Sequence, residues 1–250
     1  MRPPRRALLS GVLLVGLLGG ILALPATTRQ GFNSHVSERH VPLGIKTLEF
    51  FLRDDQYRRS AAEITRGLAT EEARAHALFN WTQQHIHPTP QGWPIIDDHI
   101  AHILIRGYGE EDQMADVFTT LATYAGLPSF WRVIRVGNTG ALVLSFVKIN
   151  GTWTVWDVAR GVAFKNEEGR LVAVAELIQN PERVKLSVGP ASTLRQRYQQ
   201  AFEDGLTPFS VPTTLRAEEQ MPSKRILIEV QGGWRNFLAF LREKLRATSP

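Results

Sequence analysis

The sequence predicts an α+β protein in which helices come first along the chain and an antiparallel sheet follows. Two segments with apolar residues at helical spacing, residues 70–85 and 111–124, precede three segments rich in β-branched and aromatic residues. Asn150-Gly151 separates the last two of these segments, and both residues tolerate the positive φ of a tight hairpin turn. Helices followed by hairpin-connected strands are typical of α+β domains, in which helices pack on an antiparallel sheet.

Composition indicates a folded protein whose body is nearly neutral. The chain has 250 residues, 43% of them hydrophobic, so it is long enough to build a substantial core. The net charge is +5, but Arg2, Arg5, Arg6 and Arg29 all lie in an N-terminal stretch without acidic residues. The other 25 basic residues almost balance the 24 acidic ones. Because a nucleic-acid groove needs a concentrated basic surface, we expect no nucleic-acid partner.

Residues 1–29 are predicted to contain a membrane segment. Ala7–Leu24 is an 18-residue run without a charged side chain, and three arginines precede it. As a helix it would rise about 27 Å, close to the roughly 30 Å hydrocarbon core of a bilayer. A cleaved signal peptide is the alternative, although bulky Leu24 or Ile21 would then stand three residues before the cleavage site. We expect a retained single-pass anchor, with a cytoplasmic N-terminus and an extracytoplasmic (periplasmic or extracellular) body.

The chain contains no cysteine. This excludes disulfides, thiolate zinc sites and a lipid-modified cysteine anchor. It is compatible with an oxidising exterior, where free thiols are a hazard.

Residues 30–43 are predicted as a polar linker and residues 44–160 as the main domain. The linker is polar and has little apolar periodicity. Thr70 is a favourable N-cap for the helix that runs to His85, and three prolines in residues 87–94 predict an irregular loop. The domain begins with apolar residues at helical spacing, namely Ile45, Leu48, Phe51 and Leu52.

The remaining elements follow in order along the chain. The predicted strands are Phe130–Val136, Ala141–Ile149 and Thr152–Val158. Residues 161–250 are predicted as a C-terminal extension, which contains a helix over Leu194–Phe202, a strand over Arg225–Val230 and an amphipathic helix over Trp234–Leu245. The last helix either packs on the domain or binds a membrane surface or a partner.

Four segments in a fixed order resemble one known family. They are Ala73–Trp81, Arg106–Ala115, Ala125–Pro128 and Asn150–Asp157. In order and spacing they are similar to transglutaminase-like domains, and the similarity covers roughly residues 70–160. The resemblance implies a papain-like fold, in which a central helix carries a cysteine nucleophile and an antiparallel sheet supplies histidine and aspartate.

The catalytic triad of that family is degenerate in this chain. A cysteine at a helix N-terminus is activated by the helix dipole and by a histidine, which the aspartate orients. The resemblance places Glu111 at the cysteine position and Leu142 at the histidine position, and only Asp157 keeps the family's residue. All seven histidines, from His35 to His102, precede the nucleophile position. We therefore expect a pseudoenzyme with no catalytic residues, no cofactor and no metal.

The expected function is binding or scaffolding by a membrane-anchored, extracytoplasmic domain in cell-envelope or exported-polymer metabolism. Trp93 in the proline-rich loop, Tyr108 and Glu110 are candidate rim residues of a groove for a peptide, a glycan or an envelope protein. Other tryptophans are expected to fill the core, namely Trp81, Trp131, Trp153 and Trp156.

The alternative is a hydrolase or lyase with a changed mechanism. Glu111 lies close in sequence to Glu110, Asp112 and Asp116, which either complement the helix dipole or provide general acid–base catalysis. A divalent metal could assist, although no standard ligand spacing is present. The residues that could contribute ligands are His85, His87, Asp97, Asp98, His99 and His102.

Overall fold

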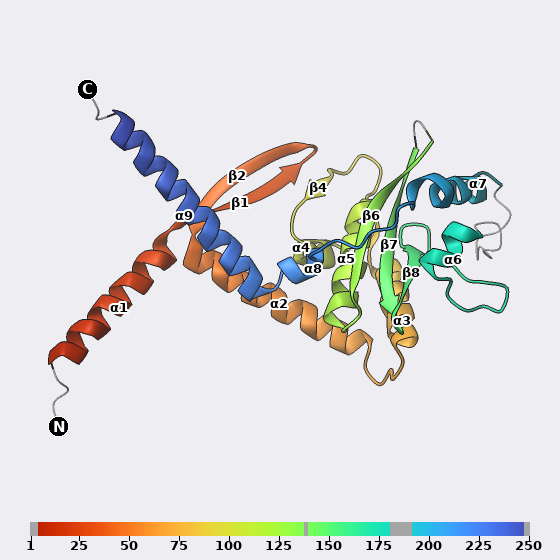
Figure 1. The fold of residues 1–250 in the computed structure, drawn as a ribbon, viewed down its shortest axis with the longest axis horizontal. Coiled ribbons are helices and arrows are strands. Elements are labelled where there is room, and N and C mark those ends of the chain that lie inside the picture. The colour runs from red at the N-terminus through yellow and green to blue at the C-terminus, as the bar shows by residue number, and fades with distance from the viewer. Residues whose placement is uncertain (1–4, 138–139, 181–191, 248–250) are drawn as a thin grey trace. The chain divides into compact units, whose positions relative to one another are not determined.

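The computed structural model describes residues 5–137, 140–180 and 192–247 (Figure 1). It contains two compact units. The terminal unit comprises residues 1–30, 35–54 and 220–250, and the central unit comprises residues 31–34 and 55–219.

The central unit is built on a four-stranded antiparallel sheet. Its strands are β6 (Ser129–Val136), β7 (Gly140–Ile149), β8 (Thr152–Asp157) and β9 (Val162–Ala163), in the order β6-β7-β8-β9. Asn150 and Gly151 have φ values of 49° and 82° and form the tight turn between β7 and β8. The sheet confirms the α+β class and all three predicted strands.

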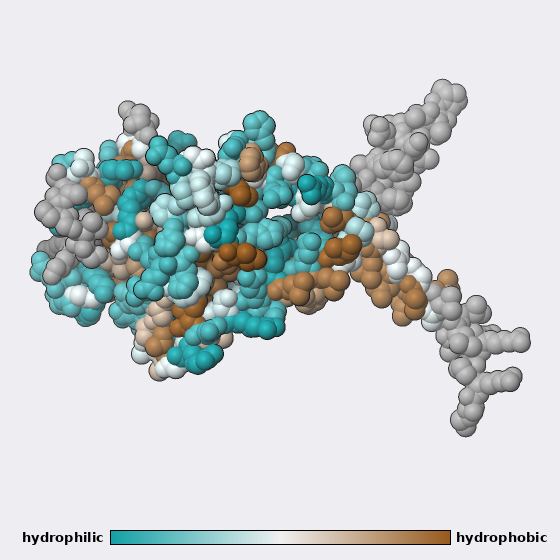
Figure 2. Space-filling view, turned by 180° about the vertical axis from the view of Figure 1, so that it is seen from behind, coloured by the Kyte–Doolittle hydropathy of each residue, from teal (hydrophilic) through white to brown (hydrophobic). Residues whose placement is uncertain are grey.

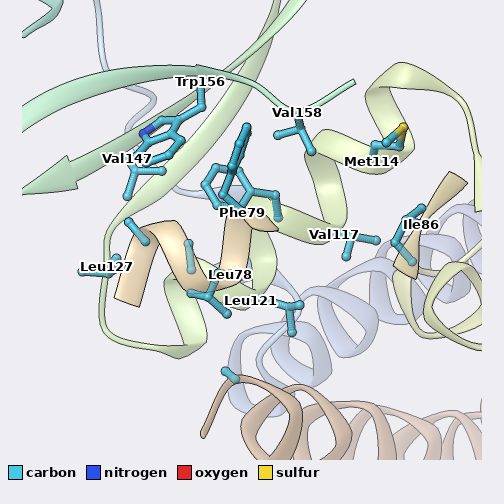
Figure 3. Packing of buried hydrophobic residues seen from close by; sticks show 14 of the residues in the cluster. Leu78, Phe79, Ile86, Met114, Val117, Leu121, Leu127, Val147, Trp156 and Val158 are labelled. Atoms are coloured by element: carbon cyan, nitrogen blue, oxygen red, sulfur yellow. The ribbon is translucent and has the colours of Figure 1, made fainter. Parts of the chain in front are cut away.

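Helices α3 (Glu71–His85) and α5 (Glu111–Tyr124) cover one face of this sheet (Figure 3). Thr70 caps α3, because its Oγ1 accepts a hydrogen bond from the Ala73 amide at 3.2 Å. The indole of Trp156 on β8 packs against the ring of Phe79 on α3, with centroids 5.0 Å apart. Both helices lie where the apolar periodicity predicts them.

A second group of helices covers the opposite face of the sheet. It consists of α6 (Val174–Gln179), α7 (Ser192–Gln200) and η2 (Ala201–Gly205), a π-helical segment. Alternate residues of β7 divide between the faces, so that Leu142 packs in the cluster of this group and Val147 in the cluster of α3 and α5. Residues of α6, α7 and η2 therefore contribute to the core of the central unit.

Short elements lead the chain into α5. Strand β3 (His87–Pro88) pairs in parallel with β5 (Tyr108–Gly109), so the proline-rich loop predicted as irregular begins with a paired strand. Strand β4 (Ile96–Asp97) pairs with the end of β1 (Pro25–Phe32), and α4 (Ile100–Arg106) follows it. Helix α8 (Arg216–Glu219) closes the central unit and contacts α5 and β6.

The segment predicted as a linker, residues 30–43, lies mostly in strands β1 and β2 (His35–Pro42). The turn between them holds Asn33 at φ 47° and Ser34 at φ 69°. Two successive positive φ values produce the twist that suits a tight hairpin, and asparagine adopts them readily. A polar hairpin has no apolar face to produce a periodicity, so apolar pattern alone did not identify it.

The strand predicted over Arg225–Val230 is wrong. These residues belong to α9 (Pro222–Ala247), which also continues through the predicted terminal helix. Pro222 suits the first turn of a helix, and Arg225 pairs with Glu229 one turn later at 3.3 Å. The strand propensity of the β-branched residues in Arg225–Val230 is therefore outweighed by these helix-favouring features.

The terminal unit also contains α1 (Arg5–Ala23) and the first part of α2 (Leu43–Ile64). Lys46 of α2 is 2% exposed, and its Nζ lies 2.7 Å from Glu229 Oε1 of α9. The same ammonium donates to the Thr27 carbonyl of β1. One buried cation thus connects three segments that are distant in sequence.

Within the part of the chain that the structure describes, we find no helix that combines the length and the apolarity needed to cross a bilayer. The transmembrane helix predicted over Ala7–Leu24 stays a prediction, and most of these residues lie in α1.

Glu229→Ala should lower the free energy of unfolding by about 3 kcal/mol, because the Lys46 ammonium would remain buried with its ion pair broken. Lys46→Met, which removes the charge and keeps the volume, should cost clearly less. Urea denaturation of the two variants measures both effects. An equal decrease in the free energy of unfolding for both variants would contradict the explanation that the unpaired, buried Lys46 charge causes the loss in Glu229→Ala.

Candidate functional site

The N-terminus of α5 is held by a capping box. The Glu110 side chain accepts from the backbone of Gln113, and Gln113 Oε1 accepts from the Glu110 amide at 3.1 Å. Gly107 has φ 71° and ends α4, and a Cβ on Gly109 would lie 2.8 Å from Gln113 Oε1. The two glycines are therefore required for the sharp turn that delivers the chain to α5.

Arg106 stabilises this turn through hydrogen bonds to the segments before and after it. Its guanidinium bonds to Asp98 Oδ1 at 2.6 Å, to the Ile96 carbonyl at 3.0 Å and to Gln113 Oε1 at 3.0 Å. Its Nε donates to the Tyr108 carbonyl at 2.8 Å. The guanidinium and the Asp98 carboxylate are almost fully buried, with side chains 12% and 8% exposed, so this is a structural network rather than a surface ion pair.

Glu111 and Asp157, two of the three positions that the resemblance assigns to a triad, meet at the start of α5, and an arginine joins them. Arg160 Nη2 lies 2.6 Å from Glu111 Oε1, and Arg160 Nη1 lies 3.0 Å from Asp157 Oδ2. The Arg160 amide also donates to Asp157 Oδ1 at 3.0 Å. Glu111 and Asp157 thus share one guanidinium as their common partner.

Asp157 lies at the end of β8, and its side chain is inaccessible to solvent. Tyr198 of α7 donates its hydroxyl to Asp157 Oδ2 at 2.7 Å. Burial and the Asp157 carboxylate raise the pKa of the Tyr198 hydroxyl far above its ordinary value, so Tyr198 remains a neutral donor. The carboxylate therefore has a partner on each side, from the loop after β8 and from the helices of the second face.

Arg160 remains a cation in this environment. Burial by itself would lower its pKa, but Asp157 and Glu111 outweigh burial and raise the pKa above its ordinary value. The arrangement is a carboxylate–guanidinium–carboxylate bridge. We call Glu111, Arg160, Asp157 and Tyr198 the Arg160 cluster.

Leu142 does not join the polar groups of this cluster. It is fully buried and pairs with Ile134 across β6 and β7. It packs in the apolar cluster beneath α6 and α7, which also includes the ring of Tyr198. The side chain at the position that the resemblance assigns to histidine therefore contributes to the core.

Arg160 and Tyr198 were missed from the sequence. Only a weak indication of the Arg160 contact is present in the sequence: Arg160 follows Asp157 by three residues, just after the predicted strand. Tyr198 lies 41 residues after Asp157, and nothing in its local pattern indicates the contact.

The predicted rim residues Trp93 and Tyr108 lie together. Their rings meet edge to face with centroids 5.2 Å apart, and the Arg106 guanidinium lies 5.4 Å from the centre of the Tyr108 ring. Trp93 is 56% exposed. Glu110, the third predicted rim residue, is only partly exposed, because its side chain accepts the capping-box hydrogen bond from the Gln113 backbone.

Asp116, one turn further along α5, has its own partners. It is buried, it accepts from Trp131 Nε1 at 2.9 Å, and Arg216 Nη2 lies 2.8 Å from its other oxygen. Arg216 also lies over the Trp131 ring at 5.4 Å. Burial raises the pKa of Asp116 above its ordinary value, although Arg216 and Trp131 oppose the shift.

The histidines considered as metal ligands do not converge. A helix does begin near Asp98, and the rings of His99 and His102 lie 5.8 Å apart, with His102 beside Asp98 at 3.2 Å. His85 instead stacks on Trp81 at 4.3 Å. Among the residues that the structure describes, no group of three or more potential ligands is close enough to hold a metal ion.

Comparison with known proteins gives no matching family model and no matching curated protein. Two solved structures are similar at low identity. A candidate cysteine protease from Cytophaga hutchinsonii is 13% identical with a TM-score of 0.38, over 51% of this chain and 45% of that one. A candidate protease from Parabacteroides distasonis is 13% identical with a TM-score of 0.33, over 60% of this chain and 42% of that one. This chain spans less than half of the length of each structure.

Arg160→Ala should lower the free energy of unfolding by about 3 kcal/mol, because the buried Asp157 carboxylate would lose its counter-ion. Glu111→Gln should cost less than about 1 kcal/mol, since Glu111 is 44% exposed and can be solvated. Thermal or urea unfolding of the two variants provides the measurement. A loss for Arg160→Ala no larger than that for Glu111→Gln would show that Asp157 does not need the arginine.

Asp116 should make stability fall as pH rises. Its pKa is raised in the folded state, so the folded protein binds this proton more tightly than the unfolded chain. That contribution is present below the ordinary aspartate pKa and is lost as pH rises through the folded-state value. In Asp116→Asn, urea unfolding at a series of pH values should lack this component of the slope.

The exposed carboxylate of Glu219 on α8 provides a matched control. Glu219→Gln should leave the slope of stability against pH nearly unchanged. The same slope in wild type and Asp116→Asn would refute the assignment.

Proposed function

We propose that this chain is a catalytically inactive, transglutaminase-like binding or scaffolding module. The observation that carries the proposal is the bridge through Arg160 between the nucleophile position, Glu111, and the aspartate position, Asp157. Acyl transfer by this family's chemistry needs a nucleophile and a base that exchanges protons near neutral pH. The bridge provides neither, because its carboxylates bind a permanent cation.

The changed-mechanism hydrolase or lyase is less well supported. General acid–base catalysis needs a carboxyl group that is free to bind and release a proton beside the substrate. Glu111 and Asp157 are bound to Arg160, and Asp116 is bound to Arg216 and Trp131. Glu110 accepts a hydrogen bond in the capping box of α5, and Asp112 accepts one from the Gln113 amide at 2.9 Å. Each acid considered for this role therefore has a structural partner.

The surface around Trp93 and Tyr108 is the candidate binding site. An exposed indole supported edge to face by a second ring offers a flat apolar surface with little rotamer entropy to lose. Such a surface suits a sugar ring or an extended peptide of the cell envelope or of an exported polymer. Arg106 supports the Tyr108 ring from within the network that positions α5.

Membrane association through Ala7–Leu24 completes the proposal. Its support is the arginine-flanked, charge-free sequence and the exposure of the described leucines of α1, such as Leu13 at 73% and Leu14 at 67%. The central unit would then be held extracytoplasmically at the membrane surface.

Sedimentation with purified peptidoglycan sacculi tests both parts of the function. The wild-type chain should co-sediment and release no soluble fragments, and Trp93→Ala should lose most of the binding, roughly tenfold for a central aromatic contact. Trp234→Ala is the matched control, because Trp234 is 58% exposed but belongs to the terminal unit.

Two results would count against the proposal. Binding that is absent, or equally strong in Trp93→Ala, would reject the aromatic surface as the binding site. Release of fragments by the wild type that Glu111→Gln abolishes would instead establish the changed-mechanism enzyme.

A further inference from the structure

The first half of α2 has apolar residues on two opposite faces. One face buries Leu43 and Phe50. On the other, Ile45, Leu48 and Leu52 recur at helical spacing and are 52%, 65% and 70% exposed. We call these three residues together with the exposed Phe51 the α2 stripe. At about 100° per residue Ile45, Leu48 and Leu52 lie opposite the buried face, and Phe51 lies at the edge of the stripe.

The buried face of α2 already has its partners within the terminal unit. Lys46 pairs with Glu229 of α9, and the Arg225 guanidinium of α9 lies 5.8 Å from the centre of the Phe50 ring. These contacts place α9 on the face of α2 that carries Lys46 and Phe50. The α2 stripe faces away from them.

The α2 stripe continues an apolar surface on α1. The Leu43 amide donates to the Leu24 carbonyl at 2.8 Å, and a Cβ on Gly44 would lie 3.4 Å from Leu22 Cβ. Figure 2 shows the hydrophobic colour on α1, at the lower right, and on the adjoining part of α2. The exposed apolar side chains of α1 include Leu13, Leu14, Val15, Leu17, Leu18, Ile21 and Leu22.

Beyond Leu52, the last residue of the α2 stripe, the next exposed side chains on this side of the helix are charged. On the same side of the helix, one turn beyond Leu52, Asp55 and Arg59 form an exposed ion pair. The apolar surface is thus limited to the turns of α2 that adjoin α1, and polar residues follow. A helix that enters the interfacial region of a bilayer at one end needs this distribution.

We propose that the α2 stripe lies in the interface of a lipid bilayer beside α1, so that two helices of the terminal unit contact the membrane. This inference rests on the membrane association proposed above. One bilayer would cover the stripe and the adjoining surface of α1 together, because the two are continuous. At the opposite, cytoplasmic end of α1, the acid-free segment with Arg2, Arg5 and Arg6 adds charge complementarity to anionic headgroups.

The absence of cysteine from the sequence makes the test site-specific. In the full chain, Leu48→Cys carries an environment-sensitive fluorophore, and Ile105→Cys, which replaces a residue 74% exposed in the central unit, is the matched control. Both are mixed with vesicles of phosphatidylethanolamine and phosphatidylglycerol that contain doxyl-labelled lipid. Quenching at position 48 should exceed that at position 105 by about threefold, since interfacial helices bury their apolar face below the headgroups.

Each other outcome has a distinct meaning. Protein that floats with the vesicles but shows equally weak quenching at both positions overturns this inference and leaves membrane association through α1 intact. Protein that does not float overturns both. Pyrene at position 48 that forms excimers without lipid quenching identifies a second copy of the chain as the occupant, which also overturns the inference. Catalytic inactivity is measured separately, by fragment release from sacculi.

Discussion

The buried Asp157 carboxylate is the constraint on which the central unit depends. A charge at this depth requires a counter-ion and hydrogen bonds, and three segments supply them. Arg160 comes from the loop after β8, Tyr198 from α7, and Glu111 from the start of α5 completes the bridge. The group therefore ties both helical layers to the end of one strand. It also holds the Glu111 and Asp157 side chains against one guanidinium.

The acidic start of α5 illustrates the same logic. Glu110 belongs to a capping box, Glu111 to the Arg160 cluster, and Asp116 to Arg216 and Trp131. Acidic residues in a first turn complement the helix dipole, but here they also position three different segments around the helix. Their concentration in the sequence is explained by structural roles, which supports the inactive-module proposal over acid–base catalysis.

The terminal unit shows how far an apolar pattern can be interpreted. Helical spacing in Ile45, Leu48 and Leu52 correctly predicted a helix, yet these side chains are exposed, and the buried face carries Lys46 and Phe50 instead. Periodicity reports that a face is apolar, whereas the partner that covers it depends on the rest of the fold. Here α9, from the other end of the chain, covers the Lys46 face and leaves the α2 stripe open.

The sequence by itself determined the elements whose signals are local: the capped α3, the amphipathic α5, and the β7–β8 hairpin with its Asn150-Gly151 turn. The resemblance to a known family also indicated that Glu111 and Asp157 belong to one region. Tertiary structure alone decided that Arg160 joins them and that Tyr198 completes the cluster. The reason is physical: a turn or a helix depends on neighbouring residues, whereas an ion pair such as Arg160–Glu111, 49 residues apart, forms only after the chain has packed.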